Sequence, residues 1–394
     1  METGDQPERH PLRSSVRPGF EFGVDPAVRI VDLFAGCGGL TLGLSQAAAT
    51  AGRRVEIALA VDFEPVATRV YRDNYPFAER IATDSVESFF DGELGAKPTF
   101  TEHKTMADIG AVTVLTGGPP CQGHSNLNNH TRRVDPKNGL YLRMVRAAEI
   151  LSPELILIEN VPAVLRDRHD GEGVVVRAER HLQDIGYQVG QAVVALDTIG
   201  VAQTRRRHVL LATRDGDIAP RLVLEALAKS ADRRDLRWAI HDLMGADDGS
   251  LRDRAPRAKA DNQARMRWML ENDAYDLPNH LRPKCHQDDH SYKSMYGRLR
   301  WEDPAQTITS GFGSIGQGRF MHPELPRALT AHEAARIQGF PDYFDFSGCS
   351  TGSALATMIG NAVPPPLGAA ILQSVFSLRA QAKAEAAFLT RRSA

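Results

Sequence analysis

The sequence predicts an α/β protein built around a doubly wound sheet, with a second, smaller and less regular domain. Strands and helices alternate from residue 29 to residue 213, a pattern typical of a mainly parallel sheet covered on both faces. After residue 214 the β-branched runs give way to a charged segment that holds Trp238 and Trp268. At 394 residues the chain is long enough for two or three structural units.

Short apolar runs mark the expected strands, and longer periodic runs between them mark the expected helices. Strands are predicted at residues 29–34, 56–61, 112–117, 154–158, 188–197 and 208–213, and helices at residues 40–49, 65–74, 139–151, 174–185 and 367–380. Residues 303–319, rich in Thr, Ser, Gly and Ile, predict further strands. Residues 1–24 are polar and without period, so we expect a mobile tail there.

Composition points to a soluble protein of the cytoplasm. The four cysteines lie far apart without a CxxC pair, which fits a reducing compartment. No apolar run approaches the ~18 residues of a membrane span, and the first residues lack a signal-peptide core. The net charge of −2 means that the protein as a whole is not basic, as many nucleic-acid-binding proteins are. Binding to nucleic acid depends on local basic patches, however, so the net charge does not exclude it. Cys285, His286 and His290 have loose metal-like spacing but no second cysteine pair, so we expect no metal.

The chain is organised around residues 112–123, VTVLTGGPPCQG. An apolar strand stops at two glycines and two prolines, and Cys121 is the first residue after that stop. Proline fixes φ and stiffens the turn, which holds Cys121 outward at the carboxyl end of the strand. Parallel α/β sheets place their ligand sites along that edge. A small buried cysteine in an ordinary loop is the alternative interpretation.

A glycine-rich turn follows the first strand and indicates a nucleotide-like ligand. Gly36, Gly38 and Gly39 allow close approach of the backbone, and the helix that follows favours an anionic group at its N-terminus. Asp62 or Glu64, at the end of the next strand, can accept hydrogen bonds from ribose hydroxyls. The spacing is not GxGxxG, so an adenosine cofactor without a pyrophosphate, such as S-adenosylmethionine, fits better. Further candidates for contact with the adenine or a sulfonium are Phe34, Phe63 and Asp84.

Four side chains expected at strand ends suggest chemistry on a cytosine ring: Cys121, Glu159, Arg205 and Arg207. Carbon 5 of cytosine is a poor nucleophile until a thiolate adds to carbon 6. That addition needs a cysteine with thiolate character, which nearby guanidinium groups promote. It also needs a carboxyl group at ring nitrogen 3 and donors to the ring carbonyl. A helix-capping carboxylate and a solvated basic loop are the alternatives for the individual residues.

These motifs, in this order, resemble the DNA (cytosine-5)-methyltransferases over residues 28–377. Residues 32–40 (DLFAGCGGL) are similar to the family's first cofactor motif, and residues 117–123 (GGPPCQG) to its nucleophile motif. Residues 159–161 (ENV) resemble the nitrogen 3 motif, and residues 203–207 (QTRRR) the arginine motif. Residues 360–363 (GNAV) match a segment that returns to the cofactor side in that family. The resemblance therefore implies a catalytic domain of residues 25–214 plus 353–385, and a small domain of residues 215–352.

The resemblance implies a Rossmann-like methyltransferase sheet and methyl transfer from S-adenosylmethionine to carbon 5 of a flipped-out cytosine in a specific duplex DNA sequence. Target recognition would fall in about residues 215–297, and a restriction endonuclease is a possible separate partner. The cofactor residues that it implies, with those proposed above, are Asp32, Phe34, Ala35, Gly36, Gly38, Gly39, Asp62, Phe63, Glu64, Asp84, Pro119, Leu140, Asn361, Ala362 and Val363. The expected DNA contacts are Gln122, Ser125, Asn126, Arg132, Arg133, Gln203, Arg252, Arg254 and Arg257.

Two residues depart from the family pattern, and three other functions remain alternatives. His124 follows the nucleophile motif where an aromatic residue is more common, and His332 precedes Glu333 where Arg is common. The alternatives are the same chemistry on RNA, a DNA-binding regulator without catalysis, and a nicotinamide oxidoreductase. The long segment 215–297 favours duplex DNA over RNA. The presence of Cys121 and its partners disfavours the other two.

Overall fold

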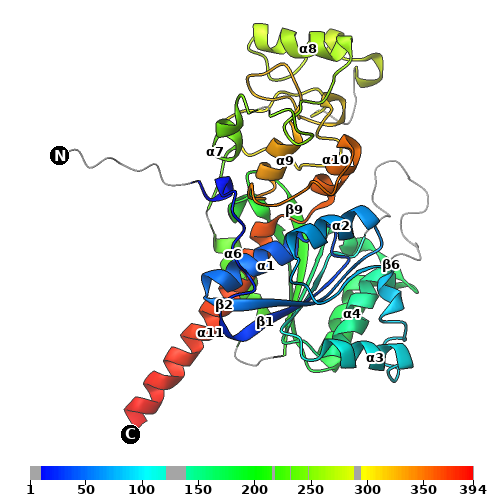
Figure 1. Ribbon diagram of the computed structural model, residues 1–394, viewed down its shortest axis with the longest axis vertical. Coiled ribbons are helices and arrows are strands. Elements are labelled where there is room, and N and C mark those ends of the chain that lie inside the picture. The colour runs from blue at the N-terminus through cyan, green and yellow to red at the C-terminus, as the bar shows by residue number, and fades with distance from the viewer. Residues whose placement is uncertain are drawn as a thin grey trace, which may run out of the picture. The chain divides into compact units, whose positions relative to one another are not determined.

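A computed structural model describes residues 10–120, 139–214, 218–230, 232–246, 248–287 and 294–393, with side chains described as far as residue 390 (Figure 1). The chain divides into two compact units. The sheet unit comprises residues 19–199, 206–232 and 363–394, and the second unit comprises residues 1–18, 200–205 and 233–362. These limits differ from the predicted ones because residues 215–232 belong to the sheet unit, whereas residues 200–205 and 353–362 belong to the second unit.

The sheet unit contains a seven-stranded sheet with the order β3-β2-β1-β4-β5-β9-β8. Five of its strands pair in parallel, and β1, β2, β4 and β5 overlap the predicted apolar runs, although β1 and β2 begin earlier than predicted. The strands are β1 (Val24–Leu33), β2 (Arg53–Asp62), β3 (Ile81–Thr83), β4 (Val114–Gly117), β5 (Leu155–Asn160), β8 (Gln188–Ala195) and β9 (Arg206–Thr213). A two-stranded ribbon of β6 (Arg168–His169) and β7 (Glu172–Gly173) lies apart from them.

The strand order reverses between β1 and β4. From β1 the chain goes to β2 and β3 on one side, and β4 then returns to the other side of β1. In open α/β sheets, ligands bind outside the carboxyl ends of the strands at such a switch point. Residues 34–39 and 118–120 directly follow β1 and β4, so the glycine turn and the approach to Cys121 lie at this position.

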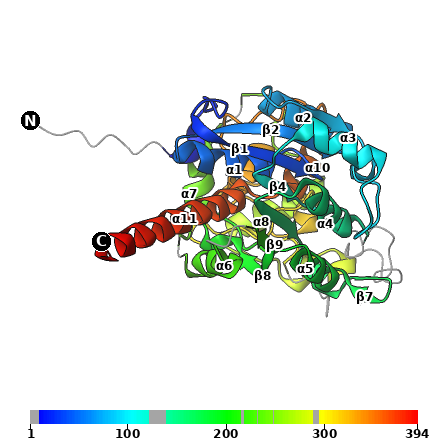
Figure 2. The ribbon, with the colours of Figure 1, turned by 90° about the horizontal axis from the view of Figure 1, so that it is seen from below.

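Helices cover both faces of the sheet. Figure 2 shows α1, α6 and α11 on one side and α3, α4 and α5 on the other. The helices of this unit are α1 (Gly39–Thr50), α2 (Pro65–Asn74), α3 (Phe100–Ile109), α4 (Gly139–Leu151), α5 (Val174–Asp184), α6 (Pro220–Lys229) and α11 (Pro365–Ser393). The C-terminal helix α11 packs on α1, so the end of the chain braces the helix that follows the glycine turn.

The crossing of α1 and α11 depends on two glycines. A Cβ on Gly43 would lie 1.9 Å from the carbonyl oxygen of Pro365, and one on Gly368 would lie 2.7 Å from that of Leu40. The obstructing atoms are backbone, which cannot rotate away. The two helices therefore approach as closely as they do because neither position carries a side chain.

The second unit is built from short helices joined by long irregular segments. Its α-helices are α7 (Leu236–Ile240), α8 (Ala260–Glu271), α9 (Ala331–Ile337) and α10 (Gly352–Asn361). The strands expected over residues 303–319 are absent from this described segment, which instead forms turns, an isolated bridge from Ala305 to Gln203, and one short 3-10 helix, Ile315–Gln317. Four glycines at positions 311, 313, 316 and 318 weaken strand propensity there.

The expected mobile tail is partly wrong. Residues 11–13 form a 3-10 helix, and the carbonyl oxygens of Leu12 and Ser14 accept hydrogen bonds from the amides of Asp342 and Tyr343. Arg13 also forms an ion pair with Asp242 at 2.8 Å. The periodicity of apolar residues could not predict that this segment is ordered, because it is held by hydrogen bonds to residues far away in the sequence.

One helical stretch is long and apolar enough to cross a membrane by length and composition, although the sequence analysis predicted no such segment. It covers residues 352–390, and its most apolar window has a mean hydropathy of 1.3. That window is 61% buried inside the protein, as the core helix of a globular fold would be.

Candidate active site

The turn between β1 and α1 is an irregular backbone cradle. Phe34, Gly36 and Gly38 all have positive φ, at 56°, 54° and 89°. Nothing lies within 4 Å of a Cβ placed on Gly36, so this glycine faces open space. A Cβ on Gly38 would instead lie 2.6 Å from the Tyr75 ring, whose hydroxyl donates to the Gly38 carbonyl oxygen. The turn is therefore packed on one side and open to a ligand on the other.

Asp62 holds this turn in place. One carboxylate oxygen accepts from the Gly36 amide at 2.8 Å, and the other accepts from the Glu64 amide at 2.9 Å. Burial raises the pKa of Asp62, partly offset by these two hydrogen bonds. Glu64 itself is exposed at the start of α2. Of the two carboxylates predicted for ribose, the structure thus leaves Glu64 as the accessible one.

Asp32, predicted to contact the cofactor, is buried instead. Its side chain is 1% exposed and accepts a hydrogen bond from the Thr41 hydroxyl at 2.7 Å. Tyr71 donates to the same hydroxyl at 3.0 Å. Burial raises the pKa of Asp32 to about 7. Asp32 therefore fastens α1 to the end of β1, and we correct its role from contact to positioning.

Two further cofactor candidates of the sheet unit lie at neighbouring strand ends, and a third lies on α4. Phe63 is 65% exposed after β2, and Asp84 is exposed one residue after β3. Oδ1 of Asp84 accepts hydrogen bonds from the Ser85 amide and the Ser88 hydroxyl. Leu140 is half-buried in the first turn of α4. Because β1, β2 and β3 pair in parallel, Phe63 and Asp84 share one edge of the sheet with the glycine turn after β1.

Glu159 and Arg207 form the polar centre of the sheet unit. They lie on β5 and β9, where the antiparallel register pairs Glu159 with Val209 and so places Arg207 on the same face. The Arg207 Nε lies 2.5 Å from Glu159 Oε1, and both side chains are nearly buried, at 12% and 7% exposure. The guanidinium thus neutralises a carboxylate that the fold removes from water.

The segment that leads to Cys121 lies against this pair. A Cβ placed on Gly118 would be 3.0 Å from Glu159 Oε2 and 3.7 Å from the Val363 side chain. Asn160 donates from its side-chain amide to the Pro119 carbonyl oxygen at 3.0 Å. The carboxylate of Glu159 therefore lies over the backbone three residues before Cys121. The glycine is needed there because a side chain would push the carboxylate aside.

Several predicted residues lie outside the described residues. They are the nucleophile candidate Cys121, the DNA candidates Gln122, Ser125, Asn126, Arg132 and Arg133, and His124.

Gln203 and Arg205 belong to the second unit and serve its interior. Gln203 is fully buried and donates to Gln338 Oε1 at 2.7 Å, while its own Oε1 accepts from the Ile308 amide at 2.9 Å. The predicted DNA contact of Gln203 is therefore wrong. Arg205 is 3% exposed and donates to the carbonyl oxygens of Ile308 and Gly360 at 2.8 and 3.4 Å. The ion pair with Glu159 comes from Arg207.

The GNAV segment is divided between the two units. Gly360 packs so closely on residues 309 and 310 that a Cβ would lie 2.2 Å from the Ser310 nitrogen. Asn361 is exposed at the end of α10, and Ala362 is buried. Val363 already belongs to the sheet unit, where it lies beside Gly118.

Comparison with known proteins decides the family. A family model of C-5 cytosine-specific DNA methylases matches residues 28–377. The chain belongs to this family. The methylase is 40% identical over 357 residues to the Type II methyltransferase M1.BsuMI of Bacillus subtilis (strain 168), covering 90% of this chain and 82% of that one. It is 31% identical to the Type II methylase M.HgiDII of Herpetosiphon aurantiacus, covering 88% and 94%. It is therefore a DNA cytosine-5 methyltransferase.

Solved structures show the same fold. A DNA modification methyltransferase encoded within an E. coli prophage aligns with a TM-score of 0.61 at 21% identity, covering 89% of this chain and 99% of that one. The S. pombe Dnmt2 methyltransferase aligns with a TM-score of 0.56 at 18% identity, covering 90% and 98%. The Rossmann-like methyltransferase fold predicted from the sequence is thus confirmed.

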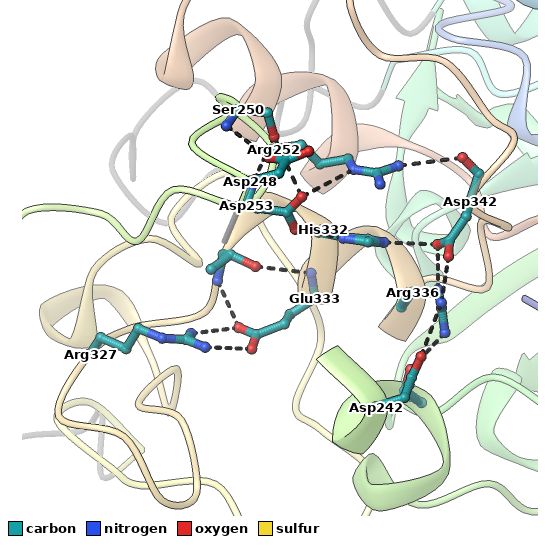
Figure 3. Close-up of polar contacts among 12 residues, drawn as sticks. Asp242, Asp248, Ser250, Arg252, Asp253, Arg327, His332, Glu333, Arg336 and Asp342 are labelled. Atoms are coloured by element: carbon teal, nitrogen blue, oxygen red, sulfur yellow. Dashed lines mark hydrogen bonds and ion pairs between the residues drawn. The ribbon is translucent and has the colours of Figure 1, made fainter. Parts of the chain in front are cut away.

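The departure at His332 has a structural role in the second unit of this methylase (Figure 3). His332 is buried, and its two ring nitrogens lie 2.6 Å from Asp253 and 2.8 Å from Asp342. Arg336 reaches Asp342 with two nitrogens at 2.6 Å each. Although burial alone would raise it, the hydrogen bonds from His332 and Arg336 hold the pKa of Asp342 well below its ordinary value. His332 therefore bridges the carboxylates of Asp253 and Asp342 at the position where the family more often has Arg.

The three arginines predicted to contact DNA are not equivalent. Arg252 is half-buried beside this network, with Nη1 3.3 Å from the Asp342 carbonyl oxygen and Nε 3.9 Å from Asp253 (Figure 3). Arg254 and Arg257 are exposed. Arg252 therefore supports the fold, and the other two remain candidates for phosphate contacts. Among the described residues no group of three or more His, Cys, Asp or Glu side chains could hold a metal ion, and His290 lies outside them.

Sequence reasoning missed the residues that support the site. Thr41 and Tyr71 fix Asp32, and Asn160 fixes Pro119, but neither residue type nor spacing in the sequence indicated these contacts. Only the ENV resemblance pointed at Asn160. Such partners are set by which strands become neighbours, and this is a property of the folded sheet.

Proposed function

We propose that this methylase transfers a methyl group to carbon 5 of a flipped-out cytosine in a specific duplex DNA sequence, through a covalent bond between Cys121 and ring carbon 6. The observation that carries the proposal is the Glu159–Arg207 pair, which lies against the backbone leading to Cys121. A carboxyl group next to a thiol is what the activation of cytosine requires.

S-adenosylmethionine supplies the methyl group as a sulfonium. The chain fits it because the turn at residues 34–39 is open above Gly36, while Asp62 holds that turn from below. Glu64 would accept from the ribose hydroxyls, and Phe63 would present its ring to the adenine. Asp84 would accept from the adenine amine. Val363 would close the same site beside Gly118.

In the chemical step, the Cys121 sulfur forms a bond to carbon 6, and the electron pair of the 5,6 double bond moves toward carbon 5. Glu159 stabilises this enamine by sharing a proton with ring nitrogen 3. Carbon 5 then takes the methyl group, which would leave S-adenosylhomocysteine, and gives its own proton to water or to a basic side chain at the site. The sulfur–carbon 6 bond breaks, the 5,6 double bond re-forms, and ring nitrogen 3 returns the shared proton to Glu159. The Cys121 thiolate is thereby regenerated.

Arg207 serves the same step in two ways. Its Nε is engaged by Glu159 and its Nη1 donates to the Arg206 carbonyl oxygen at 2.8 Å, which leaves Nη2 for the carbonyl oxygen of the ring. Arg205, which donates to the Gly360 carbonyl oxygen, would hold Asn361 in position rather than touch the base.

The DNA side rests on charge and on the chemistry of base access. Carbon 6 of a cytosine that is stacked within a duplex is out of reach of an enzyme's thiol, so the base must leave the stack. Residues 123–137 would close on the DNA, with Arg132 and Arg133 at phosphates and Asn126 or Asn128 near the vacated pair. Arg254 and Arg257 would add phosphate contacts. Since the two relatives above bear Type II names, a restriction endonuclease with the same target is the proposed separate partner.

The test is incorporation of labelled methyl groups from S-adenosylmethionine into duplex DNA and into RNA. We expect label at carbon 5 of cytosine in DNA alone, with Cys121→Ser inactive and Glu159→Gln reduced at least 100-fold. The double variant Arg132→Ala/Arg133→Ala should bind DNA more weakly. Label in RNA alone, or label that persists in Cys121→Ser, would overturn the proposal.

A further inference from the structure

A cavity in the second unit lies mostly outside the segment expected to recognise DNA. It has a volume of about 430 Å³, within the range of ligand-binding clefts. Its polar lining comes from Thr204, Asp276, Arg300, Asp303, Gln306 and Arg319. Only Asp276 of these falls within residues 215–297. Neither the family match nor the chemistry above gives this cavity a function.

Arg300 is held at this cavity with its donors unused. The carbon at the centre of its guanidinium lies 3.6 Å from the centroid of the Tyr275 ring, so the ring supports the guanidinium. The side chain is exposed, and in the described part of the chain its nitrogens form no hydrogen bond or ion pair. A guanidinium supported through its face keeps its N–H groups directed outward in a fixed plane.

The backbone on each side of Arg300 is anchored. Arg298 is buried and donates to the Pro323 carbonyl oxygen at 2.6 Å, and the Leu299 amide donates to that of Met321 at 2.9 Å. The Trp301 ring nitrogen donates to Glu324 at 2.6 Å. With both neighbours fixed, Arg300 extends from a rigid base. Binding would therefore sacrifice little backbone freedom.

The charges around the cavity favour a nucleobase over a phosphate group as its ligand. Arg319 is neutralised by Asp276 at 2.6 Å, and Asp303 balances the charge of Arg300. A phosphate site is normally rich in positive charge, whereas this lining is neutral overall. Arginine donors beside carboxylate, amide and hydroxyl groups match the mixed donors and acceptors of a base edge in the major groove.

We infer that this cavity reads one base pair of the target duplex, and that Arg300 is a specificity-determining residue that donates two hydrogen bonds to N7 and O6 of a guanine. Asp303 and Gln306, which also line the cavity, would contact the partner base or the adjacent one. The inference rests on the proposed methylation of DNA and adds a recognition residue outside the expected segment.

The experiment compares the sequences that wild-type protein and Arg300→Ala methylate in a library of duplexes, read by bisulfite sequencing. We expect the variant to accept other bases at one guanine of the wild-type target and to lose about 10- to 100-fold in kcat/KM on that target, the effect of one bidentate base contact. Arg300→Lys should not restore selection, because lysine cannot form the fork. Arg221→Ala, which removes an exposed charge from α6, is the matched control and should leave the sequence unchanged.

Replacing single target guanines by 7-deazaguanine gives a second readout, since this base lacks the N7 acceptor. One position should weaken methylation by wild-type protein and have no further effect on Arg300→Ala. The inference is overturned if Arg300→Ala keeps the wild-type sequence, or if it only weakens DNA binding evenly and lowers the salt slope by about 0.9, as loss of a phosphate contact would. Wild-type protein that leaves no 5-methylcytosine in any DNA would overturn the proposed function, and this inference with it.

Discussion

At the crossing of α1 and α11, a substitution that should stabilise an isolated helix is expected to destabilise the folded protein. Replacing Gly43, in the middle of α1, by alanine should stabilise an isolated helix by about 1 kcal/mol, because glycine is a poor helix former. In the protein, however, the new Cβ would lie 1.9 Å from the Pro365 carbonyl oxygen, 2.7 Å from the Ala369 nitrogen and 2.9 Å from the Pro365 carbonyl carbon. All three atoms belong to the backbone of α11.

The magnitude follows from the displacement that this overlap demands. Ordinary contact begins at 3.4 Å, so the helices must separate by roughly 3.4 − 1.9 = 1.5 Å at this point. Overpacking of this kind destabilises the folded protein by about 3 kcal/mol, which is the upper end of the usual range. The higher helix propensity of alanine stabilises it by only about 1 kcal/mol. We therefore expect Gly43→Ala to lower the free energy of unfolding by about 2 kcal/mol.

The assay is urea unfolding followed by circular dichroism, with Gly352→Ala as the matched control. Gly352 lies in the first turn of α10, and the nearest heavy atom to its Cβ position is Leu251 Cδ1 at 3.9 Å, so alanine should be neutral or slightly stabilising there. Gly43→Ala should lower the unfolding midpoint while the slope m stays constant. A Gly43→Ala protein as stable as wild type would refute the packing described here.

Four other variants test the site. Arg207→Ala leaves the nearly buried Glu159 without its ion pair. We therefore expect the free energy of unfolding to fall by about 3 kcal/mol and the methylation rate to fall at least 100-fold. An unchanged urea midpoint and an unchanged methylation rate would contradict this. Glu64→Ala should weaken S-adenosylmethionine binding about 10- to 100-fold, measured by calorimetry, without changing stability, because Glu64 is exposed. Asp62→Asn should lower both the binding affinity and the stability, because Asp62 holds the glycine turn. Equal effects of the two variants would refute the separate roles of Asp62 and Glu64. Burial raises the pKa of Asp32 to about 7, so folded protein retains a proton that the unfolded chain releases near pH ~4, and stability falls as pH rises from about 4 to 7. Asp32→Asn should remove this part of the pH dependence of urea unfolding, and an unchanged profile would count against it.

The sequence predicted the sheet because its signal is local. Continuous apolar runs ended by Gly, Pro or Asp predicted β1, β2, β4 and β5, and the glycine turn predicted the ligand edge. Residues 303–319 show the limit of such reasoning. Their Thr, Ser and Ile content favours strands, but their hydrogen bonds go to residues such as Gln203, about a hundred positions earlier in the chain. Composition cannot reveal partners at that separation.

The candidate site shows the same limit. Residue types predicted that Glu159, Arg205 and Arg207 would lie at strand ends near Cys121, but the β5–β9 register brings only Arg207 to Glu159, and Arg205 belongs to the second unit. Gln203 and Asp32 matched motifs by sequence, and the fold buries both. A motif identifies residues that the family retains. Whether each one contacts a ligand or supports another residue depends on the direction in which its side chain points.

The central claim is tested most directly by trapping the covalent bond between the protein and DNA. A duplex with 5-fluorocytosine at the target position blocks the final step, because fluorine at carbon 5 cannot leave as a proton does. With S-adenosylmethionine present, mass spectrometry should show a one-to-one adduct that survives denaturation and maps to the peptide containing Cys121. Cys121→Ser should give none, and Gly352→Ala should give as much as wild type. Wild-type protein that methylates ordinary DNA but forms no adduct with the fluorinated duplex would contradict the account.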